Sequence, residues 1–319
     1  MNDDIFERLH PGFTGDLSEL LKRNGFDVDV SIEDEEDCKK RTTLICDFAR
    51  NNLENIDDLC KELQRDKGQR DFLIKYYQAW GHCLQLSIIH HRMLEDAYCV
   101  LETSFDEEYI KEVVLLQLMR KGIQTYAEVV TLLKNGYPYG AIALARNLFE
   151  LMVIIRFIAQ ENEMVARGYY EASQKPLDQQ NGNKNYEWAK TAECIDEKER
   201  KRMCLGLLQE KCEMTDPKFG EVFGFHCKFV HATPYAINLG TGAVSDMIYS
   251  ERTMVGVEAP ATNSALFISS MVVTLVNHFK HPEFRLKGMF CVEWENLIIE
   301  AYDSAARKLD AEYGGQSNE

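Results

Sequence analysis

The chain has 319 residues, of which 45% are hydrophobic and 28% are charged, a composition typical of a folded protein with a substantial core. Its formal net charge of −16 repels the phosphate backbone at long range, so non-specific DNA binding is not expected; RNA or a nucleotide could bind only in a local pocket. The first ten residues, MNDDIFERLH, have neither a cationic segment nor an apolar run, so we expect no signal peptide.

The N-terminal part is predicted to be an acidic arm followed by a helix. An acidic run occupies residues 33–37, and apolar residues near helical spacing predict a helix over residues 37–64. Apolar residues then recur every three or four positions over residues 70–102 and again over 107–134, which predicts two long helices. We therefore divide the chain into an N-terminal arm and helix, residues 1–66, and a helical core domain, residues 67–319.

The centre of the chain is predicted to form a helical hairpin. Asn135-Gly136 ends the helix over residues 107–134, because glycine tolerates the left-handed conformation at a helix C-terminus. Pro138 suits the first turn of the next helix, which runs to Gln160. This apolar helix is expected to be fully buried.

The C-terminal half is predicted to hold shorter elements and two more core helices. Residues 174–185 form a loop, 186–214 a charged helix, 216–231 a short helix and 234–258 an ordered loop. Core helices follow over residues 260–280 and 289–313. The predicted fold is all-α, an up-down bundle of long helices with crossover connections, built around residues 138–160.

Neither of the two most apolar stretches is expected to cross a membrane. Residues 141–158 contain Arg146, Glu150 and Arg156, and residues 265–276 are too short for a bilayer. The ten cysteines include no CxxC pair, so we expect reduced thiols and a cytoplasmic protein.

Arg146 and Glu150 are the first candidate functional residues. They are four residues apart and share one face of their helix. Arg146 could bind an anion while Glu150 orients it or acts as a base. Alternatively, the two form an ion pair that joins neighbouring helices.

The second candidate is His231, which precedes Ala232-Thr233-Pro234. It could act as a general acid or base, or it could be a satisfied core or capping group. Cys227 lies four residues before it, but two ligands do not form a metal site, so we expect no metal. His226 is a candidate ligand contact.

Aromatic residues supply further candidates for ligand binding. Tyr137 and Tyr139 flank Pro138 and could line a pocket or pack in the turn. Trp188 is also predicted to bind a ligand. Adjacent His90 and His91 point in different directions on a helix, so at most one faces the core. The sequence has no Walker loop, GxGxxG, HExxH or GxSxG motif, and we expect no cofactor.

Several of these residues together resemble a bacterial family known only as a domain of unknown function. The resemblance covers residues 109–238 and rests on Gly136, Tyr137, Arg146, Glu150, Trp188, Val230 and His231. That family is similar to HEPN-type (higher eukaryotes and prokaryotes nucleotide-binding) proteins of toxin and phage-defence systems. Such proteins cleave RNA with an Arg and a His four to six residues apart, but no His follows Arg146 at that spacing.

Two hypotheses follow. In the first, the chain is a helical binding or regulatory module, part of a bacterial defence or toxin-type system, and Arg146, Glu150 and His231 form a buried polar network. Such a module is expected to bind a partner protein or to self-associate. In the alternative, the chain is a metal-independent ribonuclease or nucleotide-acting enzyme, in which Arg146 binds phosphate and His231 is the general acid or base. The sequence does not decide whether the protein is an enzyme.

Overall fold

The structure is a computed structural model that describes residues 67–104, 109–175, 186–214, 253–254 and 256–313, and positions 221, 224 and 227. These residues form seven α-helices and two short 3-10 helices, and no strand occurs among them. The predicted all-α class is therefore confirmed. The chain divides into two compact units, Met1–Lys75 and Tyr76–Glu319, and the second is described below. The predictions for residues 1–66, and for most of the short helix at 216–231 and of the 234–258 loop, fall outside the described residues.

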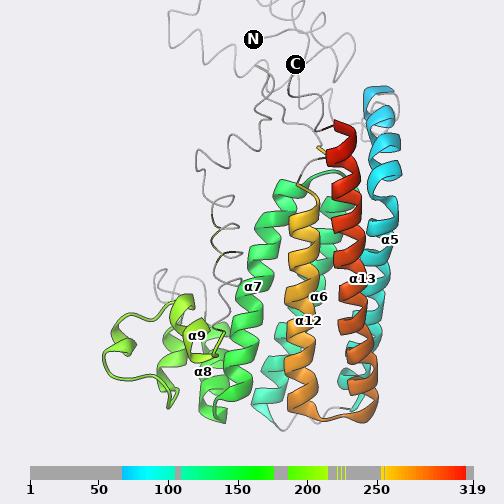
Figure 1. Cartoon of the computed structure of the whole chain (residues 1–319). Helices are drawn as coiled ribbons and strands as arrows, with labels where there is room; N and C mark the ends of the chain where they lie inside the picture. The colour runs from blue at the N-terminus through cyan, green and yellow to red at the C-terminus, as the bar shows by residue number, and fades with distance from the viewer. Residues whose placement is uncertain are drawn as a thin grey trace, which may run out of the picture. The chain divides into compact units, whose positions relative to one another are not determined.

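Five long helices build the bundle: α5 (Lys67–Ser104), α6 (Ile110–Lys134), α7 (Pro138–Gln160), α12 (Glu258–Phe279) and α13 (Pro282–Tyr313). Figure 1 shows α6 and α7 antiparallel, α7 and α12 running in the same direction, and α13 returning beside α12. Helix α7 packs on α6 and α12, and α12 packs on α13. Because α7 and α12 are parallel, residues 161–257 form a crossover connection, which confirms the predicted bundle type.

The turn between α6 and α7 contains the predicted helix-ending glycine and helix-starting proline. Gly136 has a φ of 77°, in the left-handed region that glycine adopts without strain. Its N–H donates to the carbonyl of Leu133 at 3.0 Å, and the N–H of Tyr137 donates to that of Leu132 at 2.9 Å. This bond pattern is a Schellman motif. Pro138 occupies the start of α7, so the hairpin is confirmed.

Buried polar side chains connect three helices inside the bundle, α5, α6 and α13. Ser87 of α5 lies 3.3 Å from the hydroxyl of Tyr302 on α13. His90 of α5 is fully buried, with Nδ1 3.1 Å from the hydroxyl of Tyr126 on α6. His91 is half-buried and lies 3.6 Å from the carboxylate of Glu95. One histidine of the pair therefore faces the core, as predicted.

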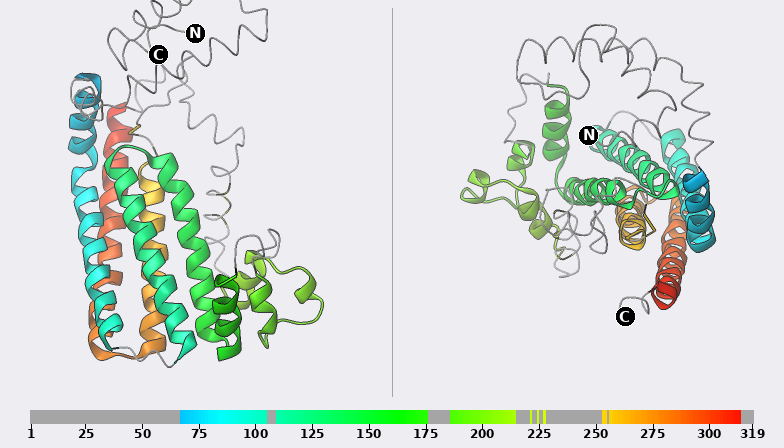
Figure 2. Two further views of the ribbon diagram at one scale, coloured as in Figure 1. Left: turned by 180° about the vertical axis from the view of Figure 1, so that it is seen from behind. Right: turned by 90° about the horizontal axis from the view of Figure 1, so that it is seen from above.

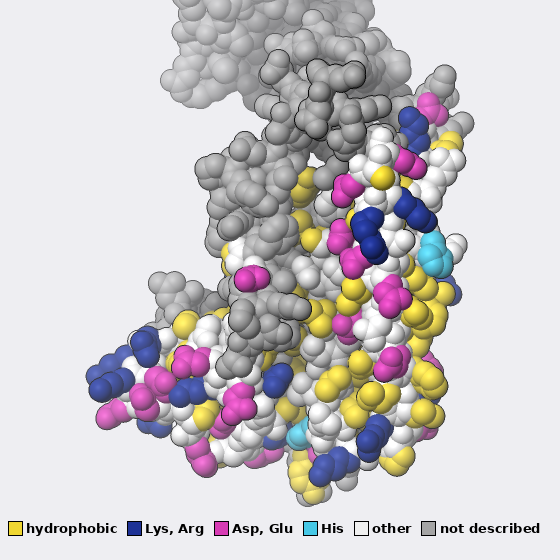
Figure 3. Space-filling view, in the orientation of Figure 1, with side chains coloured by type: hydrophobic (Ala, Val, Ile, Leu, Met, Phe, Trp, Pro, Cys, Tyr) yellow, Lys and Arg dark blue, Asp and Glu magenta, His cyan; other side chains and the backbone are white. Residues whose placement is uncertain are grey.

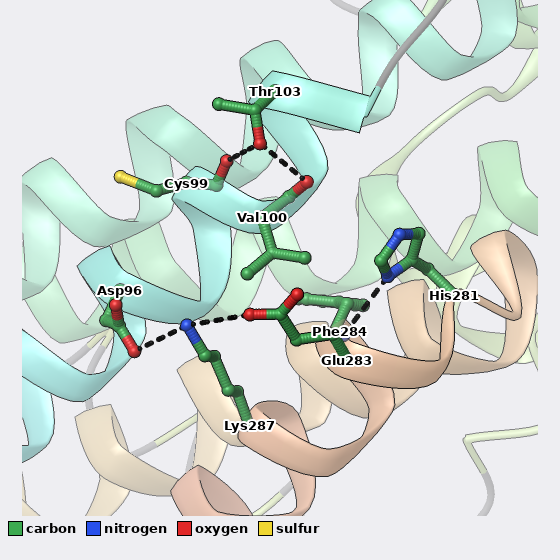
Figure 4. A network of polar contacts seen from close by, with 8 residues as sticks. All are labelled: Asp96, Cys99, Val100, Thr103, His281, Glu283, Phe284 and Lys287. Atoms are coloured by element: carbon green, nitrogen blue, oxygen red, sulfur yellow. Dashed lines mark hydrogen bonds and ion pairs between the residues drawn. The ribbon is translucent and has the colours of Figure 1, made fainter.

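Helices α5 and α13 are also joined near the end of the bundle where α13 begins (Figure 4). Lys287 of α13 points towards α5 and binds Asp96 at 3.0 Å and Glu283 at 3.2 Å. The backbone N–H of Phe284 donates to Nδ1 of His281 at 3.3 Å. Helix α13 begins at Pro282, seven residues before the predicted start at 289.

Helices α12 and α13 approach closely at Gly288. A Cβ atom there would lie 2.8 Å from Cγ2 of Val276 and 2.9 Å from Cγ1 of Val272. Both valines are β-branched and stiff at χ1, so they give way only if the helices move apart.

We expect Gly288→Ala to lower the free energy of unfolding by about 1–3 kcal/mol, the usual effect of overpacking. Gly81→Ala is the matched control, because a Cβ at Gly81 meets nothing nearer than 3.9 Å. The control should be as stable as the wild type or up to about 1 kcal/mol more stable, because alanine has a higher helix propensity than glycine. Urea denaturation of both variants tests this, and equal effects would contradict a close approach at Gly288.

A small lobe packs beside the C-terminal half of α7 (Figure 2) and consists of α8 (Glu163–Ser173), η2 (Glu187–Thr191), η3 (Glu199–Lys201) and α9 (Leu205–Lys211). The prediction of one helix over residues 186–214 is therefore wrong. Asp196 accepts the N–H groups of Lys198 and Glu199 at 2.8 Å, and Glu199 accepts that of Asp196 at 2.9 Å. Such local side-chain bonds compete with a continuous helix.

Among the described residues, α12 is the one helix long and apolar enough to span a membrane. It has 22 residues, more than the predicted apolar core of residues 265–276, and 61% of its most apolar window is buried inside the protein. That burial fits a core helix packed between α7, α6 and α13.

Candidate functional site

The candidate site is centred on Arg146 and Glu150, one turn apart on α7. Nη1 of Arg146 lies 3.5 Å from Oε2 of Glu150. Their side chains are 25% and 28% exposed. The ion pair is therefore present, but the expectation that both residues are fully buried is wrong. The pair lies at a partly covered surface, where a ligand could reach the guanidinium group.

Tyr186 completes the arrangement from another segment of the chain. It is the residue immediately before η2, and its hydroxyl donates to Oε1 of Glu150 at 2.5 Å. Glu150 thus accepts Tyr186 on one oxygen and pairs with Arg146 through the other. Burial raises the pKa of Tyr186 well above its ordinary value, and the hydrogen bond to Glu150 and its charge raise it further. Tyr186 therefore remains a protonated donor at neutral pH and cannot serve there as a base.

Trp188 holds this segment against α7 and α8. It is 8% exposed, and its ring lies edge-on to Phe157 of α7 at 6.1 Å and to Tyr169 of α8 at 5.0 Å. A Cβ at Gly168 would lie 3.1 Å from the backbone oxygen of Trp188, so α8 approaches η2 closely. Trp188 is therefore an anchor of the lobe, and its ring is largely covered.

Tyr169 connects the anchor to the polar group. Burial raises its pKa, and the negative charge of Glu150 raises it further, which means that the two side chains are close enough to interact. Tyr169 and Tyr186 thus both lie near the Arg146–Glu150 pair, and their raised pKa values keep both neutral at pH 7.

The other predicted residues lie elsewhere or outside the described residues. Tyr137 is the residue before α7 and is exposed, while Tyr139 is half-buried in its first turn, where burial raises its pKa. Tyr139 precedes Arg146 by two helical turns on the same face, about 10 Å along the axis. His226 and His231 are not among the described residues, so their distance from Arg146 stays a prediction. In the part of the chain that the structure describes, no three His, Cys, Asp or Glu residues are grouped as metal ligands.

Sequence reasoning found the Arg146–Glu150 pair and missed Tyr186. The pair has a local signal, the spacing of four residues on an apolar helix. Tyr186 is 36 residues away from Glu150, and nothing in its neighbours indicates which carboxylate it binds. Trp188, two residues after Tyr186, was a sequence candidate, but Tyr186 itself was not.

The middle of the chain is similar to a known protein family. No curated protein and no solved structure matches the chain significantly. The model of a protein family does match, over residues 112–243. That range includes most of α6, all of α7 and α8, and the segment with Tyr186 and Trp188. In this region the chain is similar to a family of unknown function, DUF5677.

Proposed function

We propose that this chain is a helical binding module whose site is the Arg146–Glu150–Tyr186 group. One observation carries the proposal: Glu150 is held on its two oxygens by residues from two segments, Arg146 at 3.5 Å and Tyr186 at 2.5 Å. An ion pair that is a quarter exposed contributes little to stability. A guanidinium group that is fixed in one orientation, however, is suited to planar recognition of an anion.

The ligand that suits this site is a small molecule with a single carboxylate or phosphate group. One arginine can bind such a group through two parallel hydrogen bonds. A polyanion is a poorer fit, because the chain carries a net charge of −16 and long-range repulsion opposes its approach.

The same proposal gives the module a regulatory role. We assign it to the bacterial cytoplasm, as a sensor or immunity component of a defence or toxin-type system. Support comes from the resemblance carried by Arg146, Glu150 and Trp188 and from the thiol-rich sequence without CxxC pairs. Ribonuclease activity through Arg146 and His231 is the competing function.

The test is ligand binding by the full chain and its Arg146→Ala variant. Carboxylated and phosphorylated metabolites are screened by thermal shift, and the affinities of hits are measured by calorimetry. We expect Arg146→Ala to weaken binding by about tenfold or more, the effect of losing a charged hydrogen bond. Its stability should fall by only about 1 kcal/mol, because Tyr186 still satisfies Glu150.

Arg156→Ala is the matched control, since Arg156 is also a half-buried arginine of α7. It should leave the affinity unchanged. Binding that is unaffected by Arg146→Ala, or an absence of any hit, contradicts the proposal. Cleavage of RNA by the wild type that both Arg146→Ala and His231→Ala abolish would assign the ribonuclease function instead.

A further inference from the structure

The first half of α13 carries an apolar stripe on its outer face. The stripe consists of Leu286, Met289, Phe290 and Leu297, which are 43–61% exposed. Their spacings of three, four and eleven residues place them along one side of a helix. Figure 3 shows hydrophobic side chains gathered over this half of α13. Exposed Glu293 lies on the same face, between Phe290 and Leu297. Several exposed apolar side chains on one face mark an interaction surface, whereas isolated exposed apolar residues are ordinary.

The bundle itself does not need this stripe. The opposite face of α13 provides the packing residues, and Phe284, Cys291, Ile298 and Tyr302 are all at most 1% exposed. Beyond Leu297 the exposed positions of α13 become polar, as at Glu300 and Arg307. The outer apolar face is therefore confined to the half of the helix that ends at Leu297.

Charges at the ends of the stripe favour an antiparallel contact. Exposed Arg285 lies at its N-terminal end and exposed Glu300 beyond its C-terminal end. The neighbouring cation, Lys287, is turned towards α5 and is bound to Asp96 and Glu283 (Figure 4), which also compensates the charge of Glu283. A parallel pair of α13 helices would set Arg285 against Arg285 and Glu300 against Glu300, whereas an antiparallel pair brings Arg285 of each copy towards Glu300 of the other. The two Glu293 side chains come close together in both arrangements, so the charges at the ends decide the direction.

We propose that the α13 stripe is the contact of a homodimer, in which two copies of α13 pack antiparallel about a two-fold axis. An axis midway between Leu286 and Leu297 sets Leu286 against Leu297 of the partner subunit, as a self-complementary interface requires. Phe290 lies near the axis and is the central anchor. This interface goes beyond the proposed ligand site, which lies on a different helix.

The first test is the oligomeric state of the full chain by sedimentation velocity over a wide concentration range. We expect a dimer with micromolar affinity or better. Phe290→Glu should raise the dissociation constant by about 30-fold or more, as expected for a central anchor. Met164→Glu is the matched control, because Met164 is a similarly exposed apolar residue on α8, and this variant should dimerise like the wild type.

The second test asks whether the two helices are antiparallel. Arg285→Glu and Glu300→Arg should each weaken the dimer several-fold. The double variant should restore it, because residues 285 and 300 then carry opposite charges again, exchanged in each copy. Glu293→Gln should strengthen the dimer, since an axis at this position brings two Glu293 carboxylates close together. Circular dichroism checks that each variant is folded.

Three results overturn the inference. A wild type that is monomeric at every concentration means that something else covers the stripe, either another part of this chain or a different protein. A dimer that is insensitive to Phe290→Glu places the interface elsewhere. Single charge variants that weaken the dimer, with a double variant that weakens it further, exclude the antiparallel arrangement.

Discussion

Trp188→Ala is expected to lower the free energy of unfolding by about 3–5 kcal/mol, the usual cost of removing a large buried aromatic side chain. The ring is 8% exposed and contacts Phe157 and Tyr169 from two different helices. Its removal leaves a cavity between α7 and α8, and Gly168 cannot fill that space. Denaturation followed by far-ultraviolet circular dichroism measures the loss.

The same variant should damage the candidate site. Tyr186 is only two residues before Trp188 and is positioned by the packing of this segment, so its bond to Glu150 should be lost together with the anchor. Trp188→Phe is the control, because it keeps an aromatic ring, and it should cost about 1 kcal/mol and leave the site intact. If Trp188→Ala keeps nearly full stability, Trp188 does not anchor the lobe.

Native-state hydrogen exchange can show where the loss occurs. In Trp188→Ala, amides of α8 and α9 should exchange much faster, whereas those in the centres of α6 and α12 should keep most of their protection. Equal loss of protection everywhere would mean that the lobe and the bundle unfold as one unit.

The long helices were predictable because their signals are local and repeated. Gly136 and Pro138 mark the hairpin, and the spacing of apolar residues indicated α5, α6, α7 and α12 within a few residues. The start of α13 was placed too late. Pro282 is a first-turn signal that could have corrected it, but the residues after it, Leu286 to Phe290, include the outer apolar stripe and do not follow a single-faced pattern.

The lobe and the candidate site were predictable only in part, because long-range contacts determine them. Residues 186–214 contain enough helix-forming residues to predict a helix, yet the Asp196–Glu199 bonds and the burial of Trp188 break the segment into short turns. The exposure of Arg146 depends on what covers α7, which periodicity cannot reveal. Tyr186 reaches Glu150 through the fold of the lobe, so its role follows from tertiary structure.

His90 should make the stability of the protein fall steeply in mild acid. Burial lowers the pKa of His90 from 6.5 to about 4, while a nearby backbone carbonyl of Cys291 partly opposes this shift. Because the unfolded chain binds a proton here more readily than the folded chain, stability is full above pH 6.5 and is lost as the pH falls towards 4. The difference of about 2.5 pKa units corresponds to about 3 kcal/mol.

His90→Phe isolates this contribution, because it fills the site with an apolar ring that cannot be protonated. The hydroxyl of Tyr126 loses its bond to His90 but keeps Ser87 as a partner, so the variant should lose only about 1 kcal/mol at pH 7. Between pH 6.5 and 4 the wild type should lose about 3 kcal/mol more than His90→Phe. Burial also raises the pKa of Glu295, so the ionisation of Glu295 destabilises the fold as the pH rises. This effect opposes that of His90, and it is the same in the wild type and in His90→Phe. Urea denaturation at several pH values gives both curves, and parallel curves would mean that His90 is already protonated, or reaches water, in the folded state.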